Sequence, residues 1–284
     1  MSLMTPGATP FPAFTVSPGQ PDPNSVASLA ERRASGKPGW RWPLFFCFVR
    51  FPLLAAGFAV AFGVYHASGV AHPGVLAQAF TRYDTPLLAD IICLGLLVWR
   101  LRREGLTLKD LLRPTRRRLM RDLLLGVLIL APVAGVVGVF NVLYTLFSPS
   151  TALQGAGISS ILNPLGTPWH VAITLLVIPI TSGVTEELVY RGYALPRLDA
   201  LTGRRWLAIA IMAAGFGLQH VAFSLVDWRL ALIGGVSTLV VGVAYGVFYF
   251  LARQRLLPLM LLHWQADFVA LGLVPLLLTL LGVG

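Results

Sequence analysis

The sequence predicts an all-α fold, a polytopic membrane bundle of about seven transmembrane helices. Of the 284 residues, 56% are hydrophobic and only 12% are charged, and the mean hydropathy is +0.75. A typical soluble domain carries about 25% charged residues, so this chain has too little charge to cover a water-facing surface of its size. The composition therefore excludes a soluble enzyme and a disordered protein.

Long apolar runs give the positions of the predicted membrane helices. In chain order their approximate bounds are 43–65, 84–99, 123–147, 170–195, 206–226, 230–251 and 257–281. The second run is short and contains Asp90, so its composition supports a full span least well. In the fourth run, we expect Pro179 and Gly183 to loosen the helix and free backbone groups beside a cavity.

The remaining sequence divides the chain into three parts. Residues 1–40 are rich in Pro, Gly, Ser and Ala, which predicts a disordered cytoplasmic tail. Residues 41–165 form the N-terminal transmembrane helices, interrupted by a basic cytoplasmic loop at 100–121. Residues 166–284 hold the later spans and the polar motifs described below.

The basic residues predict the orientation of the chain, which has a net charge of +10. With the N-terminus in the cytoplasm, nearly all Lys and Arg fall on or near the cytoplasmic side, as the positive-inside rule requires. This predicts a multi-pass protein of the cell inner membrane or plasma membrane, in contact with the lipid bilayer and with no nucleic-acid partner. The loop at 100–121 has a second interpretation, which is binding of anionic lipid headgroups.

Four acidic residues lie inside predicted spans, where an unpaired charge costs about 2.5–3.5 kcal/mol and tends to be functional. They are Asp90, Glu186, Glu187 and Asp267. Glu187 and Arg191, in the run EELVYR, are four residues apart and should pair on one helix face. Glu186 then points about 100° away without a local partner, which suits a general base or acid. The alternative is a buried network in which both glutamates only fasten helices together.

Two later spans carry histidines. His220 ends the run FGLQH, one turn after Phe216, and HWQAD places His263 and Asp267 four residues apart. An aspartate at this spacing can orient the imidazole, or both can ligate a metal. Counted from the cytoplasmic basic residues, Glu186, His220 and His263 lie at depths of about 17, 22 and 12 Å. Tilted helices could therefore bring them together.

EELVYR, FGLQH and HWQAD, in this order and on separate helices, resemble the three signatures of the CPBP family (CAAX proteases and bacteriocin-processing, or Abi, proteins). The resemblance covers about 170–284 and implies that residues 166–284 form a CPBP-like catalytic membrane core. It implies an intramembrane endopeptidase that hydrolyses membrane-associated protein or peptide substrates with an activated water. The implied catalytic residues are Glu186 as general base, His220 assisting it, and His263 with Asp267 stabilising the oxyanion. The implied positioning residues are Glu187, Arg191 and Phe216.

The resemblance leaves the cofactor open, because family members have been described both as metalloproteases and as glutamic proteases. Either a divalent metal such as zinc takes part or none does. The ligands of such a metal would be Glu186, His220, His263 and Asp267. At the position of Asp267 the family has Asn or Asp. An ionised aspartate cannot donate a hydrogen bond to an oxyanion, whereas asparagine can. The position therefore favours a role in binding metal or in orienting the histidine.

Two other classes of function stay open. One is a non-catalytic CPBP-fold membrane scaffold or a bacteriocin immunity (self-protection) protein. The other is a transporter that uses the buried acids as a proton relay. The absence of a detectable inverted repeat in the sequence argues against a transporter. The HExxH motif of zinc-dependent intramembrane proteases and the GxGD motif of aspartyl ones are both absent from the sequence.

Overall fold

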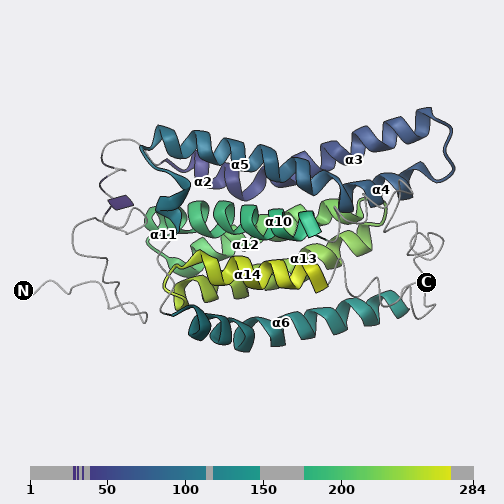
Figure 1. Ribbon diagram of the computed structural model, residues 1–284. Helices are drawn as coiled ribbons and strands as arrows, with labels where there is room; N and C mark the ends of the chain where they lie inside the picture. Colours follow the sequence, from purple (N-terminus) through teal and green to yellow (C-terminus); the bar gives the residue numbers. More distant parts are fainter. Residues whose placement is uncertain are drawn as a thin grey trace, which may run out of the picture.

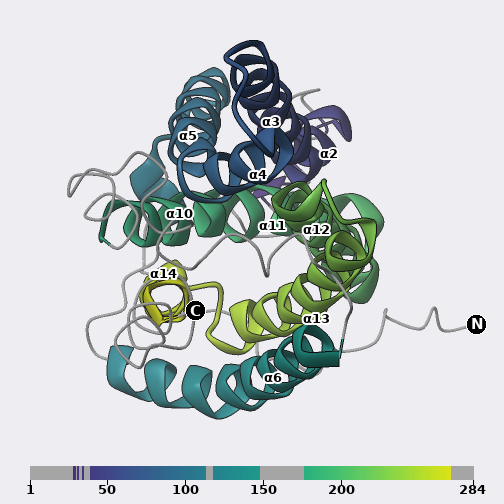
Figure 2. The same ribbon diagram turned by 90° about the vertical axis from the view of Figure 1, so that its right-hand side faces the viewer.

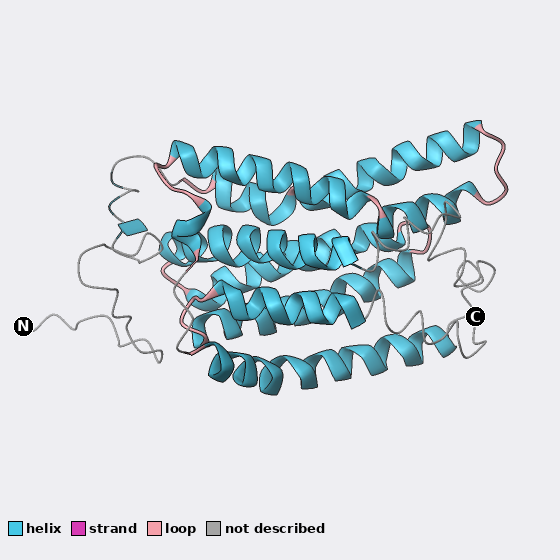
Figure 3. Cartoon of the chain, viewed as in Figure 1, coloured by secondary structure: helices cyan, strands magenta, loops and turns pink. Residues whose placement is uncertain are grey.

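A computed structural model of the chain describes residues 39–112, 118–147 and 176–269, together with residues 28, 29, 31 and 34. In these residues every regular element is a helix, and the longer helices run side by side in one bundle (Figures 1 and 3). The predicted all-α fold is confirmed. The predicted tail at 1–40 lies almost wholly outside the described residues, as do the start of the fourth predicted span and the end of the seventh.

The elements follow one another without a strand in the described residues. They are α2 (Arg41–Phe48), α3 (Arg50–Ala67), α4 (Pro73–Tyr83), α5 (Thr85–Arg103), η1 (Leu108–Leu111), α6 (Leu119–Phe147), α10 (Ile178–Glu186), η3 (Glu187–Ala194), α11 (Leu195–Thr202), α12 (Arg205–Val221), η4 (Ala222–Ser224), α13 (Trp228–Leu251) and α14 (Leu256–Asp267). The elements η1 and η4 are 3₁₀ helices, whereas η3 is a π-helix.

Four helical stretches of the described part are long and apolar enough to cross a membrane. They are Arg41–Ala67, Leu119–Val136, Arg205–Ser224 and Trp228–Leu251, which correspond to the first, third, fifth and sixth predicted spans. The other three predicted spans are also helical where they are described, but the count of seven is not confirmed. Helix α5 carries Asp90 and ends in three arginines, which lowers its apolar character.

Helix α4 was not predicted, because its sequence is short and mixed in polarity rather than a long apolar run. It begins after His72, whose backbone is left-handed (φ 59°), and Pro73 occupies its first turn. The side chain of Gln78 ties α4 to the turn before α13: its Nε2 donates to the carbonyl of Ala222 (3.4 Å), and its Oε1 accepts from the backbone N–H of Val226 (3.3 Å).

The helices that carry the sequence motifs form the middle of the bundle. Figure 2 shows α10, α12, α13 and α14 between α2–α5 on one side and α6 on the other. Pro179 lies in the first turn of α10, directly after a π-helical stretch at 176–177. The expected loosening is not seen at Gly183, since the α-helix continues to Glu186. A Cβ on Gly183 would lie 2.9 Å from the backbone nitrogen of Trp264. The glycine therefore lets the backbones of α10 and α14 touch.

Candidate active site

The two adjacent glutamates lie at the junction between α10 and the π-helix η3. A π-helix has i→i+5 hydrogen bonds, is rare, and occurs often at functional sites; here all eight of its residues are buried. The side chains of Glu187 and Arg191 form the expected ion pair, with 3.0 Å between Oε1 and Nη1. The same Oε1 atom lies 2.8 Å from Nδ1 of His263. Glu187 therefore links Arg191 to His263, which the sequence reasoning did not predict.

Aromatic rings enclose the Arg191 guanidinium. Its central carbon lies 4.5 Å from the ring centroid of Phe216 and 5.2 Å from that of Tyr245. One terminal nitrogen also donates to the carbonyl of Gly242 (3.4 Å). Cation–π contacts of this kind become stronger when the cation is desolvated, so they help to hold Arg191 beside Glu187.

Glu186 has hydrogen-bond partners on two other helices, although it has none nearby on its own. Its Oε1 accepts from Nη2 of Arg50 (2.9 Å) and its Oε2 from Nε2 of Gln219 (3.0 Å). Oε2 also lies 3.8 Å from Nε2 of His263. The prediction concerned only neighbours along one helix, so it did not include these partners on other helices.

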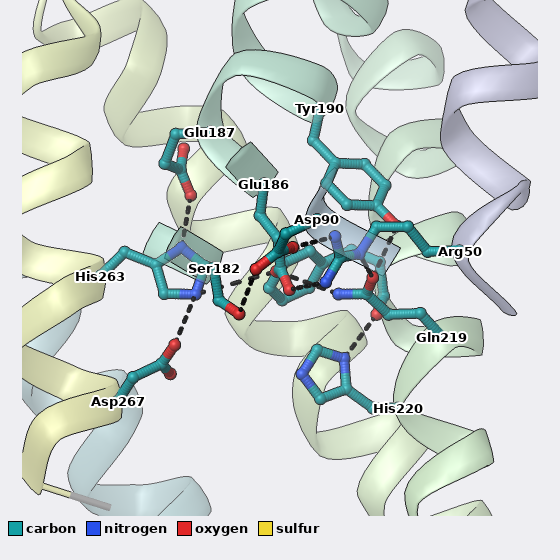
Figure 4. Close-up of polar contacts among 12 residues, drawn as sticks. Arg50, Asp90, Ser182, Glu186, Glu187, Tyr190, Gln219, His220, His263 and Asp267 are labelled. Carbon is teal, nitrogen blue, oxygen red and sulfur yellow. Dashed lines mark hydrogen bonds and ion pairs between the residues drawn. The ribbon is translucent and has the colours of Figure 1, made fainter. Parts of the chain in front are cut away.

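Arg50 and Asp90 extend this network into the N-terminal helices (Figure 4). Nη1 of the fully buried Arg50 binds Oδ1 of Asp90, and its Nε donates to Oε1 of Gln219 (2.6 Å). Ser182 Oγ donates to the other Asp90 oxygen (3.1 Å). Sequence reasoning left Arg50, Asp90, Ser182 and Gln219 without a role in the site. One signal was available for two of them: an arginine and an aspartate inside spans are expected to pair.

His220 lies near the end of α12 and is half-buried. Its Nδ1 is 2.8 Å from the carbonyl oxygen of Phe216, and its ring packs against those of Phe216 and Phe223 at centroid distances of 5.0 and 5.4 Å. A carbonyl oxygen only accepts hydrogen bonds, so Nδ1 donates. In the neutral imidazole this leaves Nε2 without a proton and able to act as a base.

His263 lies among three carboxylates. Besides Glu187 at Nδ1 and Glu186 near Nε2, Oδ2 of Asp267 is 3.6 Å from Nε2. Its ring also meets those of Tyr245 and Phe216 edge-on. His263 is buried and the Asp267 side chain is 26% exposed, so Asp267 lies toward the accessible side of the site. The ring is oriented by the short hydrogen bond that Nδ1 donates to Glu187, rather than by Asp267.

The four residues named as metal ligands are not gathered around one point. The part of the chain that the structure describes contains no group of three or more His, Cys, Asp or Glu side chains that could hold a metal ion. Nδ1 of His263 contacts Glu187 and Nδ1 of His220 contacts the carbonyl of Phe216, so Nε2 is the ring nitrogen that either histidine could offer to a metal. The reaction proposed below uses side chains alone.

The fold and the site define an integral membrane protein with glutamate, histidine and aspartate side chains gathered inside its helix bundle. Residues 168–269 match the family described as type II CAAX prenyl endopeptidase Rce1-like. This match confirms the resemblance seen in the motifs: over residues 168–269 the chain is similar to CAAX-type membrane proteases. This segment contains every site residue named by the motifs, whereas Arg50 and Asp90 lie outside it. No curated protein and no solved structure matches the chain.

Proposed function

We propose that the protein is an intramembrane endopeptidase that hydrolyses peptide bonds of membrane-associated protein or peptide substrates. The observation that carries the proposal is the contact between Glu186 and His263. These residues come from different motifs and different helices, yet Oε2 of Glu186 lies 3.8 Å from Nε2 of His263 in a buried site. Such a site can exclude bulk water and strengthen electrostatic interactions with the reacting groups.

In the proposed reaction, Glu186 is the general base and His220 assists it. A water molecule gives one proton to the Glu186 carboxylate while its oxygen attacks the scissile carbonyl carbon, and Nε2 of His220 accepts a hydrogen bond from the same water. Each carboxylate oxygen has two lone pairs, so the hydrogen bonds from Arg50 and Gln219 leave acceptor capacity for this proton. The proton then passes to the leaving amine as the C–N bond breaks.

His263 is the proposed stabiliser of the tetrahedral oxyanion. A proton on its Nε2 can be donated to the oxyanion, while Glu187 holds the other ring nitrogen. Asp267, 3.6 Å from Nε2, is placed to stabilise a positively charged ring. In this proposal Glu187, Arg191 and Phe216 position the histidines and do not touch the substrate.

The second candidate function is a non-catalytic membrane scaffold or immunity protein. One observation favours it: Glu186 and Glu187 each form an ion pair with a buried arginine, as they would in a network that only joins helices. The two candidates differ in what they require of Glu186. A scaffold needs its hydrogen bonds, whereas a peptidase needs its ability to take up a proton.

The test compares Glu186→Gln with the wild type, both purified in lipid nanodiscs and incubated with a quenched-fluorescence peptide library. Glutamine keeps the shape of the side chain but loses the base, so we expect cleavage to fall about 100-fold or more with an unchanged melting temperature. Asp110→Asn, at an exposed carboxylate of η1, is the matched control and should cleave normally. Full activity of Glu186→Gln would overturn the catalytic assignment, and a stable but inactive wild type would favour the scaffold. Stoichiometric metal in the active preparation, measured by elemental analysis, would reassign these residues as ligands.

A further inference from the structure

One guanidinium, that of Arg50, joins its own helix to three others at the candidate active site. Arg50 lies on α3 and binds Asp90 of α5, Glu186 at the end of α10 and Gln219 of α12. Its side chain is buried, as are those of Asp90 and Glu186. Neither Arg50 nor Asp90 belongs to the segment that matches the protease family.

The number of charges in this cluster exceeds what helix packing requires. A buried arginine in a membrane bundle needs one carboxylate to balance its charge, and Asp90 would be enough. The structure places Glu186 on the same guanidinium, so one positive charge faces two carboxylates. Asp90 therefore remains as a counter-ion for Arg50 whenever Glu186 carries a proton.

The geometry of the guanidinium determines where the Glu186 carboxylate lies. The group is planar and its N–H donors form a rigid fork. Asp90 and Gln219 fix two of its nitrogens, so the third, Nη2, points at Oε1 of Glu186 (2.9 Å). Gln219 holds the second oxygen, Oε2 (3.0 Å), and is itself fixed by the hydroxyl of Tyr190 (3.0 Å). Both carboxylate oxygens are thus held, with Oε2 toward His263 (Figure 4).

We propose that Arg50 and Asp90 are positioning residues of the active site, supplied by the N-terminal helices. Asp90, supported by Ser182, fixes the guanidinium, and the guanidinium fixes the orientation of Glu186. This inference rests on the proposed endopeptidase function. It deepens that function, because it makes helices outside the family-matched segment part of the site.

The main test is the double variant Arg50→Gln/Asp90→Asn, which removes one positive and one negative charge together. If the pair only fastened helices, replacing it by two amides would leave the kcat of the folded protein unchanged. If it positions Glu186, we expect a kcat lower by about tenfold or more, with KM nearly unchanged. In both cases the melting temperature falls, because Glu186 loses the cation beside it. A kcat within about twofold of the wild type would overturn the proposal, since misplacement of a catalytic group costs more than that.

A second variant, Arg50→Lys, decides the question if the double variant does not fold. Lysine keeps the positive charge but lacks the planar fork, so it cannot hold Asp90, Gln219 and Glu186 in the same geometry. We expect folded protein with a reduced kcat, higher than that of the double variant. A wild-type kcat in Arg50→Lys, or failure of both variants to fold, would assign Arg50 to stability and overturn the proposal.

Failure of the proposed function would give a different result from failure of this inference. In the first case the wild type does not cleave peptides, or Glu186→Gln cleaves as well as the wild type. In the second case the wild type is active and Glu186→Gln is inactive, but the double variant keeps its kcat. The same preparations and the same peptide library serve for the wild type, Glu186→Gln, the double variant and Arg50→Lys.

Discussion

A single oxygen of Glu187 contacts both Arg191 and His263, at 3.0 and 2.8 Å. The side chains of Glu187 and Arg191 are both fully buried, so neither has access to solvent. Removing one partner of such a pair leaves the other charge buried without compensation, which is far more costly than exchanging both. Glu187 is therefore expected to matter both for stability and for the orientation of His263.

The substitution Arg191→Ala is expected to destabilise the protein strongly, by about 3–5 kcal/mol. It leaves the Glu187 carboxylate buried without its cation and removes the contact with the Phe216 ring. The measurement is the free energy of unfolding in mixed detergent–SDS micelles, together with the amount of protein in the membrane. Arg229→Ala, at an exposed arginine of α13, is the control and should change little. Unchanged stability of Arg191→Ala would make the pair dispensable.

At the residue scale, the sequence motifs predicted pairs within one helix but not contacts between helices. The pairing of Glu187 with Arg191 depends on four-residue spacing, which can be read from the sequence. The contact of Asp90 with Arg50 joins residues 40 positions apart, and that of Glu186 with Arg50 joins residues 136 apart. Such contacts depend on how the helices pack, which spacing within a helix does not determine.

At the scale of elements, the site depends on close contact between α10 and α14. The contact at Gly183 leaves no room for a side chain, since an added Cβ would meet the backbone nitrogen and Cα of Trp264 at 2.9 and 3.2 Å. Small residues at helix interfaces in membranes allow this close approach. Trp264 is the neighbour of His263, so the position of the histidine depends on the space at Gly183.

We therefore expect Gly183→Ala to lower both stability and peptide cleavage. The methyl group must push α14 away from α10, and overpacking of this kind costs about 1–3 kcal/mol; the shift would also lengthen the hydrogen bond between Glu187 and His263. Gly95→Ala in α5 is the matched control, because nothing lies within 4 Å of its added Cβ. It should be neutral or slightly stabilising, since alanine favours a helix more than glycine does. Equal melting temperatures and cleavage rates for the two variants would contradict the packing argument.

The elements themselves were predicted with uneven success. Four of the seven predicted runs became helices of membrane-spanning length in the described part of the chain, since an apolar run of that length is a strong signal by itself. The amphipathic helix α4 and the π-helix η3 were missed. A π-helix differs from an α-helix only in its hydrogen-bond register, for which the sequence EELVYR carries no recognisable pattern.

At the scale of the whole molecule, buried ion pairs join the helices at the end of the bundle that carries the basic residues. Arg197 of α11 donates to Glu104, just after α5, at 2.6 Å, and Arg255, just before α14, donates to Asp122 of α6 at 2.6 Å. The arginines that close α5 lie at the same end. Some of the basic residues counted in the charge balance thus hold loops in place, in addition to their expected role in orientation.

The orientation predicted from charge can be tested with single cysteines, because the natural Cys47 and Cys93 are buried and should not react. Ser68 is exposed in the turn after α3, and Lys109 is exposed in η1, which follows α5. The end of α3 and the end of α5 lie at opposite ends of the bundle (Figure 1). With a cytoplasmic N-terminus, the positive-inside rule places Lys109 inside and Ser68 outside. We expect a membrane-impermeant maleimide to label Ser68→Cys in intact cells, and Lys109→Cys only after permeabilisation. The opposite pattern would invert the topology, and labelling of the wild type would show that the natural cysteines are accessible.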